Sequence, residues 1–175
     1  MKVIIISGER GEGKTTFLKK TISELNKRNR TVYGFYAENT KDDSGKEGYR
    51  IYDVSNNSSQ LLCKRNAPET GNLNLLEFWF DEKTITKGEN WIRKGFEKNN
   101  PVFVLDEAGK FELDGFVWDN ILKQILKQNK GTLIVTVRNK FVTKVTEKYQ
   151  LNSHDLYLQD NLLFTVEFVD KIERG

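Results

Sequence analysis

The hydrophobic positions of this chain follow two different periods. Continuous apolar runs at Lys2–Ser7, 102–107 and Thr132–Val137 are typical of parallel strands that are buried on both faces. Apolar residues at helical spacing separate these runs, and they predict helices that begin near Lys14 and cover about 82–98, 116–128 and 140–149. We expect Gly131 to end the third of these helices. The alternation predicts an α/β fold with a mostly parallel sheet flanked by helices.

A group of segments near the middle of the chain has strand character without intervening helices. Residues 31–38, TVYGFYAE, are rich in β-branched and aromatic residues and predict a strand. The polar residues 39–48 are expected to form a loop or turn. Residues 49–54 and 60–63 flank SNNSS, which is a turn composition. They predict an antiparallel β-hairpin that is inserted as an appendage of the parallel sheet.

The remaining segments complete one domain. Short strands are expected at 76–80 and 155–158, and residues 162–172 fit either a helix or a strand. A length of 175 residues, with 37% hydrophobic residues, suits a single α/β domain over 1–175. The chain shows no internal repeat and no long linker.

The composition indicates which cellular compartment and which kinds of partner are expected for this protein. No apolar run approaches the roughly 20 residues of a membrane span, and the first run is too short for a signal peptide. The single cysteine, Cys63, has no internal partner for a disulfide. These features favour a cytoplasmic protein without a membrane partner. A net charge of +3 does not by itself indicate nucleic acid, and the basic residues near 19–30 suit the end of a solvated helix.

The segment GERGEGKT, residues 8–15, joins the first apolar run to the first predicted helix. It matches the phosphate-loop pattern of glycine, four residues, Gly-Lys and then Ser or Thr. Glycines let successive backbone N–H groups turn toward a phosphate chain, and the following helix N-terminus attracts the same anion. Lys14 would reach the β- and γ-phosphates, and the Thr15 hydroxyl would ligate Mg²⁺. The residues expected to bind nucleotide here are Gly8, Glu9, Arg10, Gly11, Glu12, Gly13, Lys14, Thr15 and Thr16.

The apolar run VFVLDE carries the second half of the predicted site. Asp106 follows a core strand at the edge where open α/β sheets bind ligands, and it can hold Mg²⁺ opposite Thr15. Glu107 comes next, and a carboxylate there can orient and deprotonate a water for in-line attack on the γ-phosphate. Arg138 follows a later core strand, where it would either stabilise charge on the γ-phosphate or lie exposed at the strand end. Glu107, Lys14 and Arg138 are therefore the candidate catalytic residues.

The same segment also matches the Asp-x-x-Gly of GTPases, through Asp106 and Gly109, which adds Gly109 to the candidate nucleotide-binding residues. GTPases also carry Asn-Lys-x-Asp after a later strand, where the Asp holds guanine. Here Asn139 and Lys140 are present, but Val142 stands in place of the Asp. This replacement removes the charge-assisted contact to guanine, so the sequence disfavours a guanine-specific switch.

In order along the chain, GERGEGKTT, GFYAE, the hairpin segments YRIYDV and QLLCKRN, and VLDEAGKFEL resemble a known family. They are similar to the small, broad-specificity nucleoside-triphosphatases of the RecA-like branch of P-loop proteins, which have an additional strand and a catalytic glutamate. The resemblance covers about 1–137 and, more loosely, QDN at 159–161. It implies a RecA-like P-loop fold in which 8–15 bind the triphosphate, Asp106 serves the metal and Glu107 serves the water.

The sequence departs from the family pattern at both ends. Glu9 and Arg10 stand where the family usually has a variable residue and Pro, and Glu12 adds a carboxylate. We expect these side chains to point outward, because backbone N–H groups make the phosphate contacts. Residues 159–161 lack the arginines of the family's C-terminal segment.

The motifs together predict an enzyme that hydrolyses nucleoside 5′-triphosphates, ATP and GTP among them, to the diphosphate and phosphate with Mg²⁺. A small-molecule kinase is one alternative, although no arginine-rich lid segment is visible and an Asp-Glu pair suits water better than an acceptor hydroxyl. A nucleotide-dependent interaction module with little turnover is the other alternative. Lys110 and Glu112 are expected to form a supporting salt bridge rather than to act in catalysis.

Overall fold

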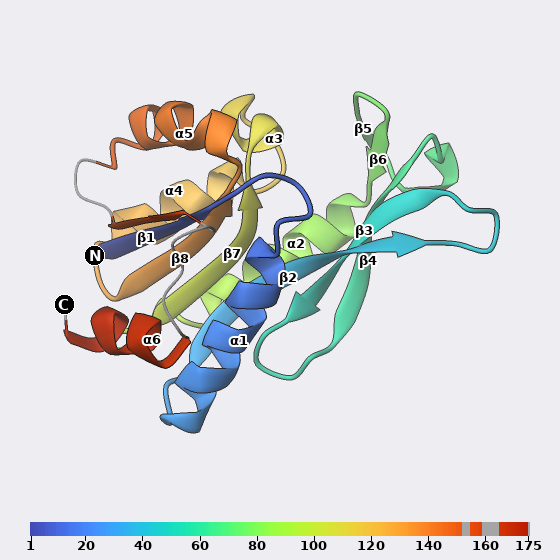
Figure 1. Cartoon of the computed structure of the whole chain (residues 1–175). Helices are drawn as coiled ribbons and strands as arrows, with labels where there is room; N and C mark the ends of the chain where they lie inside the picture. The colour runs from blue at the N-terminus through green and yellow to red at the C-terminus, as the bar shows by residue number, and fades with distance from the viewer. Residues whose placement is uncertain (152–154, 159–164, 175) are drawn as a thin grey trace.

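A nine-stranded sheet forms the centre of the computed structural model, which describes residues 1–151, 155–158 and 165–174 (Figure 1). Five strands pair in parallel in the order β2-β7-β8-β1-β9, and four continue from β2 as antiparallel strands in the order β3-β4-β6-β5. The strands are β1 Lys2–Ser7, β2 Val32–Lys41, β3 Glu47–Asp53, β4 Ser59–Arg65, β5 Leu73–Leu75, β6 Phe78–Phe80, β7 Val102–Ala108, β8 Thr132–Val137 and β9 Asp155–Leu158.

Helices cover both faces of the parallel strands (Figure 1). Helices α1 and α6 pack over one face, around a core that includes Leu18, Ile4 and Phe168. Helices α2, α4 and α5 pack over the other face, around a core that includes Phe35 and Ile121. The helices are α1 Lys14–Lys27, α2 Glu82–Arg93, α3 Lys110–Leu113, α4 Asp119–Gln128, α5 Val142–Lys148 and α6 Thr165–Arg174. Within the described residues, no helix combines the length and the apolar character that crossing a membrane requires.

The expected doubly wound architecture is confirmed, and β8 lies between β1 and β7. Gly34 allows the close approach of β2 to β7. Its φ is +126°, and a Cβ at this position would lie 1.9 Å from the Val104 carbonyl oxygen. A side chain there would therefore push β2, the strand that joins the parallel and antiparallel parts of the sheet, away from β7.

The predicted hairpin is present, but its extent was underestimated. Residues 39–48 were expected to form a loop, whereas β2 continues to Lys41 and β3 begins at Glu47. The turn between them is held by Asp42, whose carboxylate accepts N–H groups of Ser44 and Lys46 at 3.0 Å each. Polar residues form strands here because the arm projects from the body (Figure 1), so both of its faces can carry polar side chains. The arm is continuous with the sheet rather than an appendage of it.

Several predicted boundaries were also wrong. The helix expected at 116–128 begins only at Asp119, and a separate short helix covers Lys110–Leu113. Asn129, in the left-handed conformation with φ +48°, ends α4 two residues before Gly131. The strand expected at 76–80 begins at Phe78, because Leu76 occupies the turn after β5 with φ +58°. The ambiguous C-terminal segment is helical from Thr165, and 162–164 and 159–161 lie outside the described residues.

Candidate active site

The phosphate loop lies between β1 and α1, at the carboxyl end of the parallel strands. Gly11 and Gly13 have φ of +87° and +90°, which residues with a Cβ rarely adopt. Gly13 is the N-cap of α1, so the first turn of this 14-residue helix directs its free N–H groups and its positive dipole end toward the loop. This arrangement is suited to bind an anion.

Lys14 lies inside this loop. Its ammonium donates to the carbonyl oxygens of Gly8 at 2.9 Å and Glu9 at 2.8 Å, and the residue is only 6% exposed. An ammonium has three donors, so one remains for a ligand. Lys14 thus fixes the curvature of the loop and places a positive charge at its centre.

Asp106 is the buried acceptor that joins β7 to the loop. Its Oδ2 accepts the Thr15 hydroxyl at 2.8 Å and the Ala37 N–H at 3.1 Å, and its Oδ1 accepts the Thr136 hydroxyl. Burial raises the pKa of the Asp106 carboxyl, and these hydrogen bonds together with the charge of Lys14 oppose that shift. The adjacent oxygens of Thr15 and Asp106 are the hard ligands that Mg²⁺ prefers.

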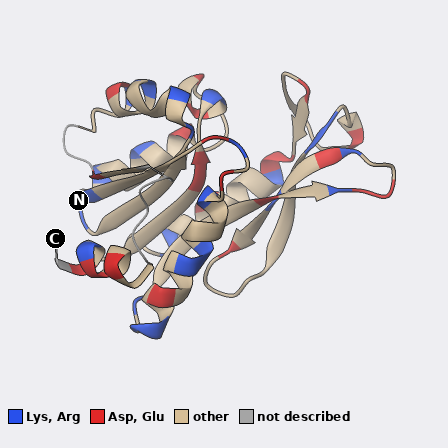
Figure 2. Cartoon of the chain, viewed as in Figure 1, with Lys and Arg blue, Asp and Glu red and all other residues tan. Residues whose placement is uncertain are grey.

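Glu107 pairs with Arg138 at the same edge of the sheet. Arg138 Nε lies 2.8 Å from Glu107 Oε1, and both side chains are about one-third exposed. Burial raises the pKa of the Glu107 carboxyl, whereas the Arg138 guanidinium lowers it. Asp106 and Glu107 are neighbours near the end of β7, and Figure 2 shows the red of Asp and Glu at the arrowhead of this strand, beside the phosphate loop. The two predicted catalytic residues from different strands therefore touch each other.

Glu112 has a different role from the predicted salt bridge with Lys110. Its carboxylate is buried and accepts the N–H of Gly109 at 2.8 Å and the N–H of Trp118 at 3.3 Å. These bonds hold the segment that follows Glu107 against the start of α4. The expectation of a salt bridge was wrong, because the side chain satisfies backbone donors at the start of the short helix α3.

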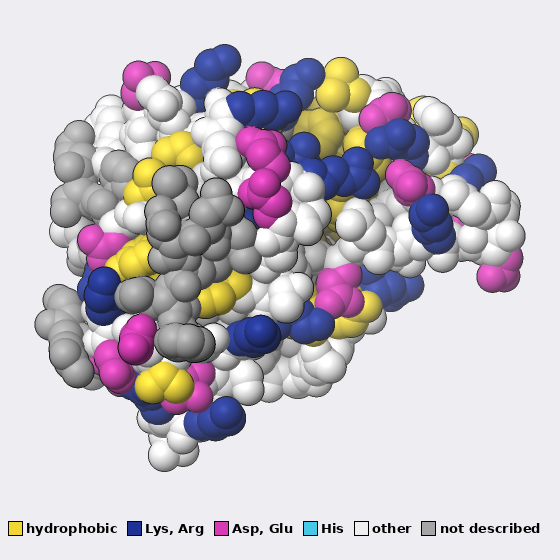
Figure 3. All heavy atoms as spheres, in the orientation of Figure 1, with side chains coloured by type: hydrophobic (Ala, Val, Ile, Leu, Met, Phe, Trp, Pro, Cys, Tyr) yellow, Lys and Arg dark blue, Asp and Glu magenta, His cyan; other side chains and the backbone are white. Residues whose placement is uncertain are grey.

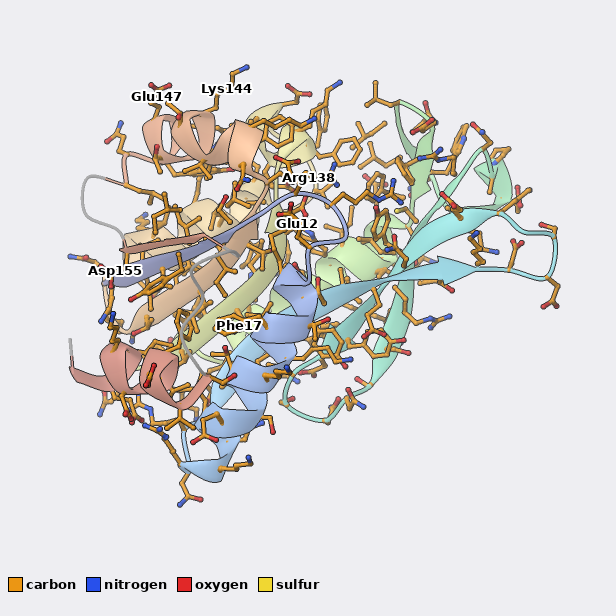
Figure 4. All side chains as sticks on the ribbon, in the orientation of Figure 1. Glu12, Phe17, Arg138, Lys144, Glu147 and Asp155 are labelled. Carbon is orange, nitrogen blue, oxygen red and sulfur yellow. The ribbon has the colours of Figure 1, made fainter. Side chains whose placement is uncertain are left out.

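The loop side chains that depart from the family pattern are exposed, as expected. The Glu12 carboxylate nevertheless turns back and accepts the Glu9 N–H at 2.6 Å. Figure 4 shows Glu12 and Arg138 at this edge of the sheet, with Lys144 on the outer side of α5. One backbone donor of the loop is thus already bonded to a side chain.

One cavity of about 540 Å³ brings most of these residues together. Figure 3 shows Lys and Arg side chains around its mouth, at the upper right of the view. Of the predicted residues, Gly8, Glu9 and Glu12 do not line it; the carbonyls of Gly8 and Glu9 instead hold Lys14. The predicted residues that line it are Arg10, Gly11, Gly13, Lys14, Thr15, Thr16, Asp106, Glu107, Gly109 and Arg138.

Motif reasoning missed some supporting residues. Thr136 is a polar residue inside the apolar run TLIVTV, and that position was a usable signal. Ala37 contributes a backbone N–H, for which the sequence has no signal. The Ser7 hydroxyl bonds to the Asn139 side chain and joins the ends of β1 and β8.

A glycine-rich loop after the first strand, with Asp-Glu on a strand beyond one intervening strand, defines a P-loop nucleoside-triphosphatase fold. A family model described as NTPase matches residues 3–161. The chain therefore belongs to the NTPase family and is a nucleoside-triphosphatase.

Curated relatives and solved structures are consistent with this assignment. The nucleoside-triphosphatase THEP1 of Aquifex aeolicus is 29% identical over 140 residues, which are 77% of this chain and 76% of the relative. The THEP1 of Methanocaldococcus jannaschii is 24% identical over 98% of both chains. The crystal structure of THEP1 from Aquifex aeolicus matches with a TM-score of 0.72 at 22% identity, over 98% of this chain and 99% of that chain. The solution structure of a human cancer-related nucleoside triphosphatase matches with a TM-score of 0.74 at 18% identity, over 100% and 99%.

Proposed function

We propose that this enzyme hydrolyses several nucleoside 5′-triphosphates, ATP and GTP among them, to the diphosphate and phosphate in a Mg²⁺-dependent reaction. The observation that carries the proposal is the 2.8 Å contact between Thr15 and Asp106, with Glu107 next to it in the cavity that the phosphate loop lines. Hydrolysis needs a loop that binds the phosphates, a metal site and a base for water. The phosphate loop, the Thr15–Asp106 pair and Glu107 would supply these in turn.

Thr15 and Asp106 would hold the Mg²⁺ ion through their oxygens. The ion supplies positive charge that neutralises the β- and γ-phosphate oxygens as the bond breaks. Lys14 adds the third donor of its ammonium to the same oxygens, and the N-terminus of α1 adds backbone N–H groups.

Glu107 would orient the attacking water and accept its proton. Its partner Arg138 holds the carboxylate in place through the 2.8 Å ion pair and also brings a cation to the cavity. A guanidinium at this position can stabilise the charge that develops on the γ-phosphate. Both residues thus act on the same end of the triphosphate.

Base recognition is expected to be weak. Val142 replaces the Asp that would read guanine, and it begins α5. The neighbouring Asn139 side chain is bonded to Ser7. Binding would therefore depend on the phosphates, which all nucleoside triphosphates share.

A phosphate-release assay with ATP, GTP, CTP and UTP tests this proposal. We expect release from all four, its loss with a chelator and its return with excess Mg²⁺. The Lys14→Ala variant gives the background rate. Equal release with and without Mg²⁺, or release no faster than that background, would contradict the proposal.

A further inference from the structure

The cavity of the phosphate site continues into an aromatic chamber that hydrolysis does not require. We define the chamber by Tyr49 of β3, Phe78 and Phe80 of β6, Phe111 of α3 and Trp118, which all line the same cavity as the phosphate loop. A phosphate chain and its metal are recognised by N–H groups, cations and oxygens. Aromatic rings supply none of these groups, so this part of the cavity suits a ligand group other than a phosphate chain or a metal ion.

The chamber walls are rings that pack against one another. The ring centroids of Phe80 and Phe111 lie 5.1 Å apart at an angle of 80°, and those of Tyr49 and Phe78 lie 5.9 Å apart. Trp118 is fixed from behind by Phe35, at 4.4 Å between centroids. Such walls are preformed, and planar aromatic ligands gain from edge-to-face contacts with them.

The chamber lies beyond the γ-phosphate end of the expected nucleotide. The phosphate loop leaves β1, Glu107 lies on β7, and the chamber continues across β2 toward β3, β4 and β6. In a phosphate loop the lysine reaches the β- and γ-phosphates, and here Glu107 marks the reacting end. With the γ-phosphate at Glu107, we expect the nucleotide's own base to extend away from the chamber, which would leave the chamber free for a second molecule.

The mouth of the cavity is cationic. Arg10, Lys110 and Lys140 line it and are exposed. Figure 3 shows Lys and Arg side chains, in dark blue, around the hollow. A ligand with a ring in the chamber would place its other end near these cations, and an anionic end would complement them.

We propose that the chamber is a second ligand site, which takes a planar aromatic ring carrying a phosphate monoester while a nucleoside triphosphate occupies the phosphate loop. This inference rests on the proposed function, because the orientation of the triphosphate decides what remains free. The ring packs against Phe78 and Phe111, which contact each other edge to face with 6.4 Å between their centroids, and the phosphate lies near Lys110.

Calorimetry on the full chain tests the proposal in two stages. The first titration adds the non-hydrolysable analogue AMP-PNP with Mg²⁺, and the second adds AMP to the saturated protein. Phenyl phosphate is a second probe with a ring, and ribose 5-phosphate is a control without one. We expect AMP and phenyl phosphate to bind, and ribose 5-phosphate to bind at least about fivefold more weakly, since ring contacts are worth roughly 1 kcal/mol or more and 1 kcal/mol is a factor of about five in affinity.

Matched variants locate the site. Phe78→Ala is expected to weaken AMP binding about tenfold, whereas Trp79→Ala, its neighbour on β6, is expected to have little effect because it does not line the cavity. Lys110→Ala is expected to weaken binding about threefold or more, and Lys144→Ala on α5 is the charge control. AMP-PNP binding in each variant reports that the fold and the phosphate loop are intact.

The outcomes are distinguishable. If AMP-PNP itself does not bind, the proposed function fails. If AMP-PNP binds but neither aromatic probe does, or if Phe78→Ala and Trp79→Ala have equal effects, the second site is refuted. Binding of AMP that AMP-PNP abolishes would also refute it, because the nucleotide would then occupy the chamber.

Discussion

The buried carboxyl of Glu112 should make the stability of the enzyme depend on pH in a predictable direction. Burial raises the pKa of Glu112 from 4.5 to about 7, although the N–H groups of Gly109 and Trp118 partly oppose the shift. The folded protein therefore holds this proton over a pH range in which the unfolded chain has released it.

The charged surroundings of Glu112 do not reverse this direction. The Glu107 carboxylate raises the same pKa further. Lys148 and the Tyr149 hydroxyl bond to the backbone carbonyl of Glu112, and Lys148 also forms an ion pair with Asp119 at 2.8 Å. No cation forms an ion pair with the Glu112 carboxylate among the described residues.

The magnitude follows from the two pKa values. The contribution of Glu112 to the free energy of unfolding is fully present below the unfolded pKa of 4.5. It is lost as the pH rises toward and through the folded pKa of about 7. At about 1.4 kcal/mol per pH unit, the loss from this group reaches about 3 kcal/mol by pH 8. A large part of that loss, about 2 kcal/mol or more, falls between pH 5 and pH 8.

Glu112→Gln removes this titration while keeping the shape of the side chain. Replacing one carboxyl oxygen with an amide nitrogen removes one acceptor of a backbone N–H. This loss lowers the free energy of unfolding by about 1 kcal/mol at every pH. Urea unfolding should therefore show the variant slightly less stable than the wild type at pH 5, and more stable by about 1 to 2 kcal/mol at pH 8. Glu97→Gln, at an exposed position, is the control. A variant that is less stable by the same amount at both pH values would refute the reasoning.

Three other predictions concern single features. Lys14→Ala should weaken AMP-PNP binding by at least about 2 kcal/mol in a direct titration, and unchanged affinity would disprove the phosphate-loop assignment. Asp81→Ala should lower the free energy of unfolding by about 1 kcal/mol, because Asp81 caps α2 through bonds from Lys83 N–H at 3.1 Å and the Thr84 hydroxyl at 2.7 Å; no change in urea denaturation would contradict this. Values of kcat/KM for ATP and GTP should agree within about a hundredfold, and a larger ratio would show that the enzyme reads the base.

The sequence predicts the parallel core and the candidate catalytic residues from local signals. Continuous apolar runs identify β1, β7 and β8; the phosphate loop follows β1 directly, and the Asp-Glu pair lies near the end of β7. Parallel strands end at the same edge, so the topology brings Thr15 to Asp106 and Glu107 to Arg138.

The remaining features depend on contacts between distant segments. Residues 39–48, where β2 and β3 form the projecting arm, are polar, so they resemble a loop until cross-strand pairing is known. Glu112 looks like a surface residue in GKFEL, and only the fold of 109–118 shows that it is buried. The aromatic chamber combines β3, β6 and α3, which no local pattern connects.

The central claim is that Glu107 activates the water that attacks the γ-phosphate, and single-turnover hydrolysis by Glu107→Gln tests it most directly. Gln keeps the shape and can hold a water, but it cannot accept the proton. We expect hydrolysis to slow by about 10²- to 10⁴-fold, while the affinities for AMP-PNP and Mg²⁺ stay near those of the wild type. Near-wild-type turnover in this variant, with normal nucleotide binding, would contradict the account and remove Glu107 from the mechanism.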